Sequence, residues 1–127
     1  MEKDFDSWNR VKKETDTHES IYFRVREGEV WWCKLGLNIG VEIDGKNDKY
    51  QRPVLIIRRF NEKMFLAMPL TTKFKVDIYH HKLVRSRDSR VVLSQVRIIS
   101  AKRLTRKIFS IDPKELAIVK DKFKSLI

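Results

Sequence analysis

The chain has 127 residues and a mass of 15.2 kDa, which is enough for one domain with one hydrophobic core. Its 42% apolar residues exclude a fully disordered chain, and its apolar runs are far shorter than the about 20 residues of a membrane span. The net charge of +11 favours a polyanionic partner, nucleic acid first, with solubility or an acidic protein partner as the alternatives.

The charge is unevenly distributed, and its distribution divides the chain near residue 28. Residues 1–29 carry a net charge of −2, whereas the remainder carries +13. Phe5, Trp8 and Val11 follow one another three residues apart, which predicts a short amphipathic helix over about residues 5–15. We therefore expect a single domain over 1–127, with an N-terminal extension at 1–26 and a body at 27–127.

From Val30 onwards, β-branched and aromatic residues predict short antiparallel strands. The expected strands cover residues 30–35, 51–58 and 64–70, then a hairpin of 75–84 with 91–93 across the turn 85–89, and a last short strand at 96–99. Between the first two strands, residues 36–47 hold three glycines, and a loop of this length calls for a functional explanation.

The C-terminal segment has the signals of a helix. Asp112 is placed as the N-cap, Pro113 as the first helical residue, and Glu115 completes a capping-box pattern. One apolar face follows, made of Leu116, Val119, Phe123 and Leu126, and Ser100 is expected to cap a shorter helix through Leu104. Helix, short strands and helix together predict an α+β fold with a small, strongly bent antiparallel sheet or partial barrel.

Several kinds of catalytic site are excluded by residue type. The histidines are His18, His80 and His81, and the last two are adjacent in a predicted strand, where side chains point to opposite faces. The single cysteine, Cys33, is expected to be a small buried side chain, and no signal-peptide pattern opens the chain, so a reducing cytoplasm is expected. Phosphate-binding and dinucleotide-binding glycine patterns and Ser or Cys nucleophile motifs are lacking, so we expect neither metal nor cofactor.

Polar residues instead gather at the ends of the predicted strands. One glutamate carboxylate, two hydroxyl groups and two guanidinium groups are expected to converge beside the glycine-containing loop. The polar residues at these strand ends are Glu42, Arg52, Thr71, Thr72, Lys73, Ser94, Gln95 and Arg97. Each of them alone is more often a solvated charge or part of a turn. Only their occurrence together, in this order along the chain, favours a functional site.

That order resembles the MazF/PemK/Kid toxin family over residues 27–127. The resemblance is carried by Gly28-Glu29-Val30-Trp31-Trp32, Gly40-Val41-Glu42, Arg52-Pro53-Val54-Leu55-Ile56, Pro69-Leu70-Thr71-Thr72, Ser94-Gln95-Val96-Arg97 and the helix beginning at Asp112-Pro113. It implies an SH3-like (CcdB/MazF-type) barrel with a C-terminal helix. It also implies a metal-independent endoribonuclease that cleaves single-stranded RNA, acts as a homodimer and is inhibited by an antitoxin of a type II toxin–antitoxin pair.

The resemblance also implies roles for individual residues. Arg52 would stabilise a phosphorane, Thr71 would hydrogen-bond a non-bridging phosphate oxygen, and Glu42 would act as a base or orient Arg52. The residues expected to contact RNA are Thr72, Lys73, Lys75, Ser94, Gln95, Arg97 and Lys46. Arg85, Arg87 and Arg90 are further basic residues for guiding RNA, with an ordinary solvated surface role equally open, and Tyr50 or Tyr79 would stack on a base.

Two departures from the family leave other functions open. Some relatives have Asp where this chain has Ser94, so if that Asp serves as a base, the role must move to Glu42 here or be lost. The segment between Glu42 and Arg52 is also longer than the minimal family spacing. The alternatives are a toxin of the same fold that binds DNA gyrase, and a non-catalytic nucleic-acid-binding module.

Overall fold

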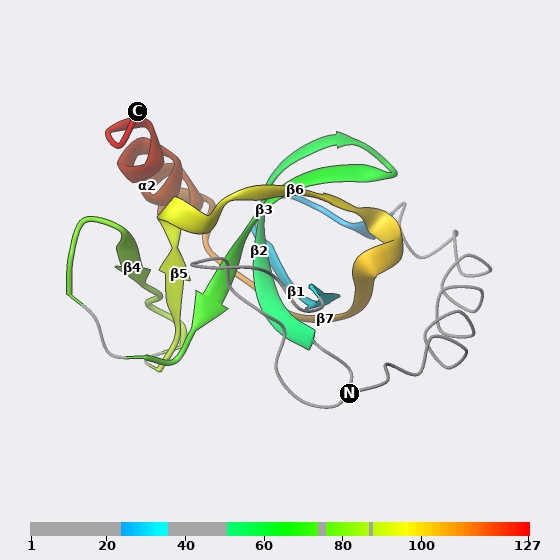
Figure 1. The fold of residues 1–127 in the computed structure, drawn as a ribbon, viewed down its shortest axis with the longest axis horizontal. Helices are drawn as coiled ribbons and strands as arrows, with labels where there is room; N and C mark the ends of the chain where they lie inside the picture. The colour runs from blue at the N-terminus through cyan, green and yellow to red at the C-terminus, as the bar shows by residue number, and fades with distance from the viewer. Residues whose placement is uncertain (1–23, 36–50, 74–75, 87) are drawn as a thin grey trace, which may run out of the picture.

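The computed structural model describes residues 24–35, 51–73, 76–86 and 88–127, which form one antiparallel sheet and one C-terminal helix (Figure 1). The elements are β1 (Glu29–Lys34), β2 (Gln51–Asn61), β3 (Met64–Thr71), β4 (His80–Lys82), β5 (Arg90–Val92), the 3-10 turn η2 (Leu93–Gln95), β6 (Arg97–Ser100), the 3-10 turn η3 (Ala101–Arg103), β7 (Leu104–Ser110) and α2 (Pro113–Lys124). The α+β class is confirmed. The helix predicted at 5–15 lies outside the described residues.

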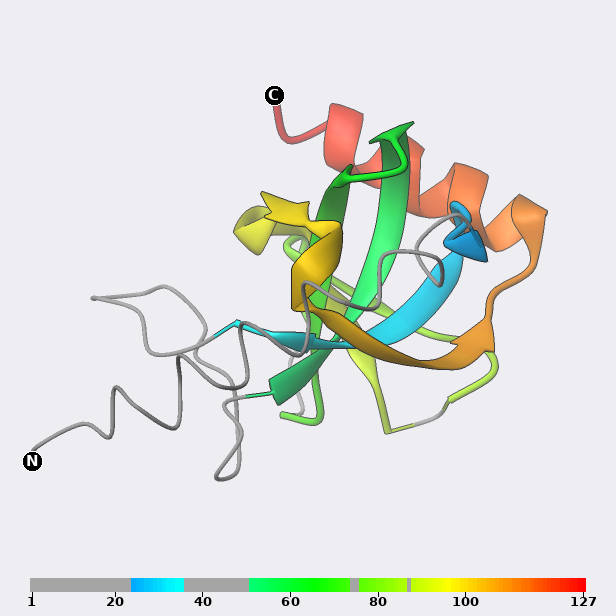
Figure 2. The same ribbon diagram turned by 90° about the vertical axis from the view of Figure 1, so that its right-hand side faces the viewer.

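The sheet has the strand order β4-β5-β3-β2-β1-β7, and β6 pairs with β3 as well. The edge of β3 is shared, because β6 pairs with residues 64–67 and β5 with residues 70–71. The sheet bends strongly between these two partners (Figures 1 and 2). Among the described residues, no pairing joins β6 to β7, so the sheet is open and the predicted SH3-like barrel is not confirmed.

Both faces of the sheet are buried, and β2 contributes to each. Val54 and Ile56 belong to one core cluster, whereas Leu55 and Ile57 belong to the other. A strand covered on both sides needs apolar residues at successive positions, which explains the unbroken run in β2. We call the first side the Trp31 face, after a member of its cluster, and the second the helix face, because α2 packs there.

The C-terminal helix begins and packs as the sequence predicts, with one difference. The Asp112 side chain accepts a hydrogen bond from the N–H of Lys114, and Leu116 and Val119 are buried in the helix-face cluster. Glu115 does not behave as the distal half of a capping box. Its carboxylate is buried and accepts hydrogen bonds from His81 and from the N–H of Val84. A partner distant in sequence therefore takes the place of the local backbone donor.

β7 is absent from the sequence-based prediction, which ends the sheet at residue 99. Arg106 and Lys107 interrupt its apolar pattern, and its pairing with β1 shifts register twice. Such irregularities remove the alternation that identifies a strand. The strand is also an edge strand among the described residues, where exposed charges are common. The 3-10 turn η3 before it is capped by the Ser100 side chain, as expected.

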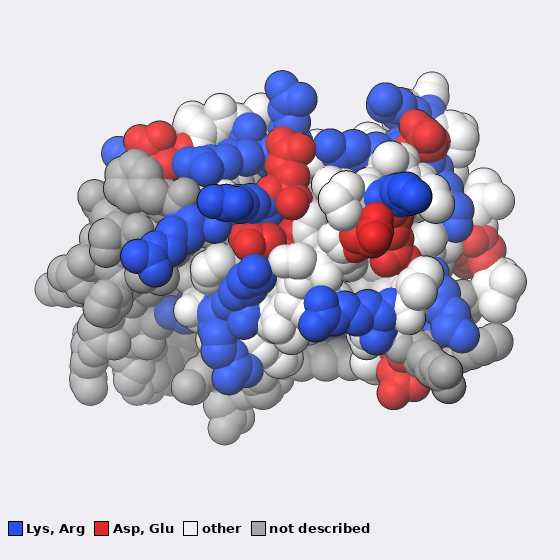
Figure 3. Space-filling view, turned by 180° about the vertical axis from the view of Figure 1, so that it is seen from behind, with Lys and Arg blue, Asp and Glu red and all other residues white. Residues whose placement is uncertain are grey.

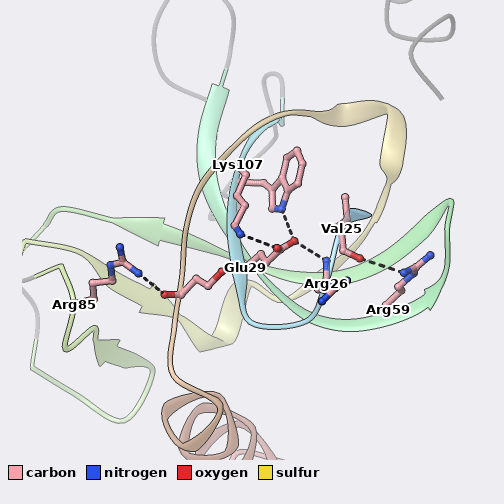
Figure 4. Close-up of polar contacts among 8 residues, drawn as sticks. Val25, Arg26, Glu29, Arg59, Arg85 and Lys107 are labelled. Carbon is pink, nitrogen blue, oxygen red and sulfur yellow. Dashed lines mark hydrogen bonds and ion pairs between the residues drawn. The ribbon is translucent and has the colours of Figure 1, made fainter. Parts of the chain in front are cut away.

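The start of β1 is fixed by Gly28 and Glu29. Gly28 has φ of 87°, a conformation that favours glycine, and its N–H and C=O bond to Ile56 and Ile111. The buried Glu29 carboxylate accepts hydrogen bonds from the Arg26 N–H at 2.7 Å and from the Trp31 indole at 3.1 Å, and pairs with Lys107 at 3.0 Å (Figure 4). These contacts hold the strand that sets the register of β2 and β7.

Candidate functional site

Arg52 and Thr71 lie together where β2 begins and β3 ends. The Arg52 guanidinium Nη1 donates to the carbonyl oxygen of Leu70 at 2.9 Å, so it reaches across to the residue before Thr71. Both side chains are buried, at 9% and 8% exposure. Arg and Thr side chains are mostly exposed in proteins, so two buried ones at neighbouring strand ends are uncommon. The structure thus brings Arg52 and Thr71, two of the predicted catalytic residues, to the same end of the sheet.

The two side chains share the Trp31 face. Alternate residues of a strand point to the same face. Arg52 is two residues from Val54 in β2, and Thr71 is four residues from Ala67 in β3, and both Val54 and Ala67 belong to the Trp31-face cluster. Val54 is directly opposite Pro69, so this series of residues in β2 and the corresponding series in β3 point to the same face. Arg52 is also directly opposite Cys33 in β1, another member of that cluster.

Beyond Thr71 the chain turns away from the sheet. The Thr71 hydroxyl oxygen accepts a hydrogen bond from the N–H of Lys73 at 3.2 Å, a turn that Thr residues often make. This leaves the Thr71 O–H proton available to a further acceptor, since a hydroxyl both donates and accepts. Thr72 and Lys73 follow directly after the end of β3, and both are exposed.

The other predicted site residues are distributed differently. Ser94 is exposed and Gln95 half-buried in η2, between β5 and β6. Arg97 lies opposite Ala67, so it shares the Trp31 face but is four residues from Thr71 along β3, about 13 Å. Arg97 therefore pairs with β3 at a different position from Thr71, although its charge acts on the Cys33 thiol, whose residue is directly opposite Arg52. Glu42, Lys46 and Lys75 lie outside the described residues.

The charges of Arg103 and Arg97 act on the thiol of Cys33, a member of the Trp31-face cluster. Burial raises the pKa of the Cys33 thiol to about 12, against the smaller opposing effect of the Arg103 and Arg97 charges. On the side of the molecule in Figure 3, Lys and Arg side chains cover much of the described surface, with Asp and Glu between them. An anionic ligand would meet a favourable potential on the side of the molecule drawn in Figure 3.

The histidines of β4 engage separate partners. His81 is buried and contacts Glu115 and Lys122 of α2, whereas the ring of His80 lies 2.7 Å from Asp77. Within the described part of the chain, no group of three or more His, Cys, Asp or Glu side chains could hold a metal ion. In the same residues, no helix is long and apolar enough to cross a membrane.

The fold is that of the MazF toxins. MazF from Deinococcus radiodurans superposes with a TM-score of 0.65 at 20% identity, over 80% of this chain and 94% of that one. A mycobacterial endoribonuclease in complex with its cognate antitoxin gives 0.63 at 15% identity, over 80% and 92%. The Mycobacterium tuberculosis toxin MazF-mt6 gives 0.59 at 15% identity, over 76% and 93%.

The family follows from the sequence profile. The profile of the PemK-like, MazF-like toxin of type II toxin-antitoxin system matches residues 26–127, and the chain belongs to this family. No curated protein sequence matches the chain. The match confirms the family predicted from the ordered motifs and begins one residue before the predicted body.

Proposed function

We propose that this chain is a metal-independent endoribonuclease that cleaves single-stranded RNA at short sequences. The single observation that supports this most is the buried Arg52 guanidinium beside Thr71 at one end of the Trp31 face. A guanidinium and a hydroxyl both donate hydrogen bonds, and the non-bridging oxygens of a phosphate accept them.

In the proposed reaction the RNA supplies its own nucleophile. The 2′-hydroxyl oxygen attacks the adjacent phosphorus, a base removes the hydroxyl proton, and the bond from phosphorus to the 5′ oxygen breaks as that oxygen gains a proton. The products are a 2′,3′-cyclic phosphate and a 5′-hydroxyl. Arg52 stabilises the charge that develops on the phosphorane, and Thr71 holds a non-bridging oxygen.

The proton transfers need a second group. A guanidinium stays protonated at any ordinary pH, so Arg52 is a poor general acid. Glu42 is proposed as the base or as the residue that orients Arg52. An unperturbed glutamate, with a pKa of about 4.3, is a weak base at neutral pH, so this role requires an environment that raises its pKa.

The proposed partners follow from the same reading. Mycobacterial and Deinococcus relatives are described in complex with antitoxins. We propose that a cognate antitoxin with an acidic segment binds the positively charged body, whose net charge from residue 30 onwards is +13. We further propose a homodimer acting on cytoplasmic RNA. Co-expression with the neighbouring open reading frame, followed by isolation of a complex, tests the antitoxin.

The test of the activity is incubation of the purified chain with a long unstructured RNA in EDTA. Cuts at a short recurring sequence are expected, with 2′,3′-cyclic phosphate and 5′-hydroxyl ends, and are lost in Arg52→Ala and Thr71→Ala. Cleavage that requires a divalent cation, or that leaves 5′-phosphates, would refute the proposed chemistry. Intact RNA with inhibited DNA supercoiling would indicate a gyrase-binding toxin. Intact RNA with salt-sensitive binding would indicate a binding module.

A further inference from the structure

Arg90 of β5 lies in the same cross-strand row as Arg52 and Thr71. The ladder between β3 and β5 places Arg90 directly opposite Thr71. Residues directly opposite in an antiparallel pair point to the same face, with Cβ atoms about 5 Å apart. Its neighbour Val91 is opposite Leu70, and both belong to the helix-face cluster, so Arg90 itself is on the Trp31 face.

Thr71 is therefore flanked on both sides by arginine. The strands are about 4.8 Å apart, and Arg52 and Arg90 belong to the two strands that border the end of β3. The Arg90 side chain therefore starts one strand from Thr71 on one side, and the Arg52 guanidinium reaches the Leu70 carbonyl oxygen on the other. A single phosphate seated on Thr71 has two non-bridging oxygens, enough for one guanidinium at each side.

The burial of Arg90 distinguishes it from Lys73 and Arg85, two other basic residues named for guiding RNA. Its exposure is 6%, lower than that of Arg52, whereas Lys73 and Arg85 are exposed. An arginine held at low exposure loses part of its hydration, so its attraction for an anion is stronger than at the surface. Two such cations on one face attract an anion more strongly than the same number of exposed lysines would.

We propose that Arg90 is a second arginine of the scissile-phosphate site and contacts that phosphate from the side opposite Arg52. This inference rests on the proposed function and adds a residue to it. The phosphorane carries more negative charge than the phosphate before attack. Because Arg90 is fixed in the sheet, its contact strengthens as that charge develops and acts mainly on kcat.

The row continues one strand further, to Lys82 of β4. Lys82 is directly opposite Arg90 and is exposed, while its neighbour His81 is turned to α2 on the helix face. Lys82 is two strands from Thr71, about 10 Å, which is too far for the same phosphate but suitable for the next one. The RNA backbone therefore follows the row from Thr71 towards β4, and Lys82 contributes to binding rather than to kcat.

The experiment compares Arg90→Gln, Arg90→Lys and Lys82→Gln with the unchanged full chain. The matched control is Lys124→Gln, an exposed cation at the end of α2 on the helix face. Cleavage of a single-stranded RNA is measured at saturation and at low substrate. Binding of an uncleavable 2′-O-methyl RNA of the same sequence is measured as a function of salt, and circular dichroism checks the fold of each variant.

Arg90→Gln is expected to lower kcat on the order of 100-fold, the usual effect of losing one donor to a developing oxyanion. It should also reduce the slope of log K against log salt by about 0.7, the value for one phosphate contact on a single strand. Arg90→Lys should keep the salt slope of the unchanged chain, because the positive charge remains. Its kcat should nevertheless fall nearly as far as that of Arg90→Gln, because an ammonium lacks the planar fork of donors. Lys82→Gln reduces the slope alone, and Lys124→Gln changes neither quantity.

A folded Arg90→Gln variant with unchanged kcat and salt slope would overturn the proposal. If Arg90→Gln does not fold, full kcat in Arg90→Lys would overturn it instead. If the unchanged chain binds the RNA but cleaves none, the endoribonuclease proposal fails, while the salt slope still decides whether Arg90 contacts a phosphate. If the unchanged chain binds no RNA, both proposals fail.

Discussion

The Glu115 carboxylate of α2 and the His81 ring of β4 form a buried hydrogen bond of 3.0 Å from Nε2 to Oε2. The same Oε2 accepts the N–H of Val84 at 3.0 Å, and Lys122 Nζ lies 2.8 Å from the other ring nitrogen of His81. Because an ammonium only donates, this ring nitrogen is the acceptor and the proton is on Nε2. The helix is thus joined to the hairpin that carries Arg90.

Removal of this carboxylate is expected to destabilise the fold. Glu115→Ala leaves the Val84 N–H and the His81 ring without their acceptor in a buried place, which costs about 3 kcal/mol. Urea denaturation would measure the loss. Asp121→Ala, at an exposed position of the same helix, should change the free energy of unfolding by less than about 0.5 kcal/mol. Equal midpoints for the two variants would contradict the assigned role of Glu115.

The Thr71 hydroxyl is expected to be needed for cleavage. Thr71→Val keeps the shape but removes the donor, so kcat on a single-stranded RNA should fall about 100-fold. Thr71→Ser retains the hydroxyl and should restore most of the rate. Thr105→Val on β7 is the matched control, since it removes a hydroxyl that donates to the Trp32 carbonyl oxygen at 3.3 Å. Full activity of Thr71→Val would exclude a contact between this hydroxyl and the phosphate.

The sequence predicts much of this fold because several of its signals are local. The apolar run of β2 and the Asp112 cap depend on neighbouring residues, and both are confirmed. The partner of Glu115 is 34 residues away, and β7 is held to β1 by a register that shifts, so neither could be found from local pattern.

The same limit applies to the candidate site. Arg52 and Thr71 could be selected because they belong to ordered motifs of a family. Arg90 belongs to none of those motifs, and its position opposite Thr71 is decided by the pairing of β3 with β5. Strand pairing depends on contacts distant in sequence, so a one-residue change of register would have turned Arg90 to the helix face.

The Cys33 thiol is expected to be unreactive in the folded protein. Its burial raises the pKa to about 12, and the thiolate is the reactive form. Iodoacetamide at pH about 8.5, near the ordinary thiol pKa, should label the chain in urea but not in buffer. Mass spectrometry reads one modification, because Cys33 is the single cysteine. Labelling of the folded chain at the rate of the unfolded chain would contradict the burial.

Glu27 is expected to make stability depend on pH on the acidic side. Burial raises the pKa of this carboxyl, but the Arg59 N–H at 2.9 Å, the Lys120 ammonium at 3.2 Å and the charge of Arg58 together hold it below 4.5. A lowered pKa in the folded state means that the stabilisation is present above pH 4.5 and is lost as the pH falls through the folded value. Below that pH, the melting temperature of Glu27→Gln should therefore fall less steeply than that of the unchanged chain. The control Glu62→Gln, in the β2–β3 turn, should show the same dependence of melting temperature on pH as the unchanged chain. Parallel profiles for Glu27→Gln and the unchanged chain would show that the carboxylate does not link folding to proton binding.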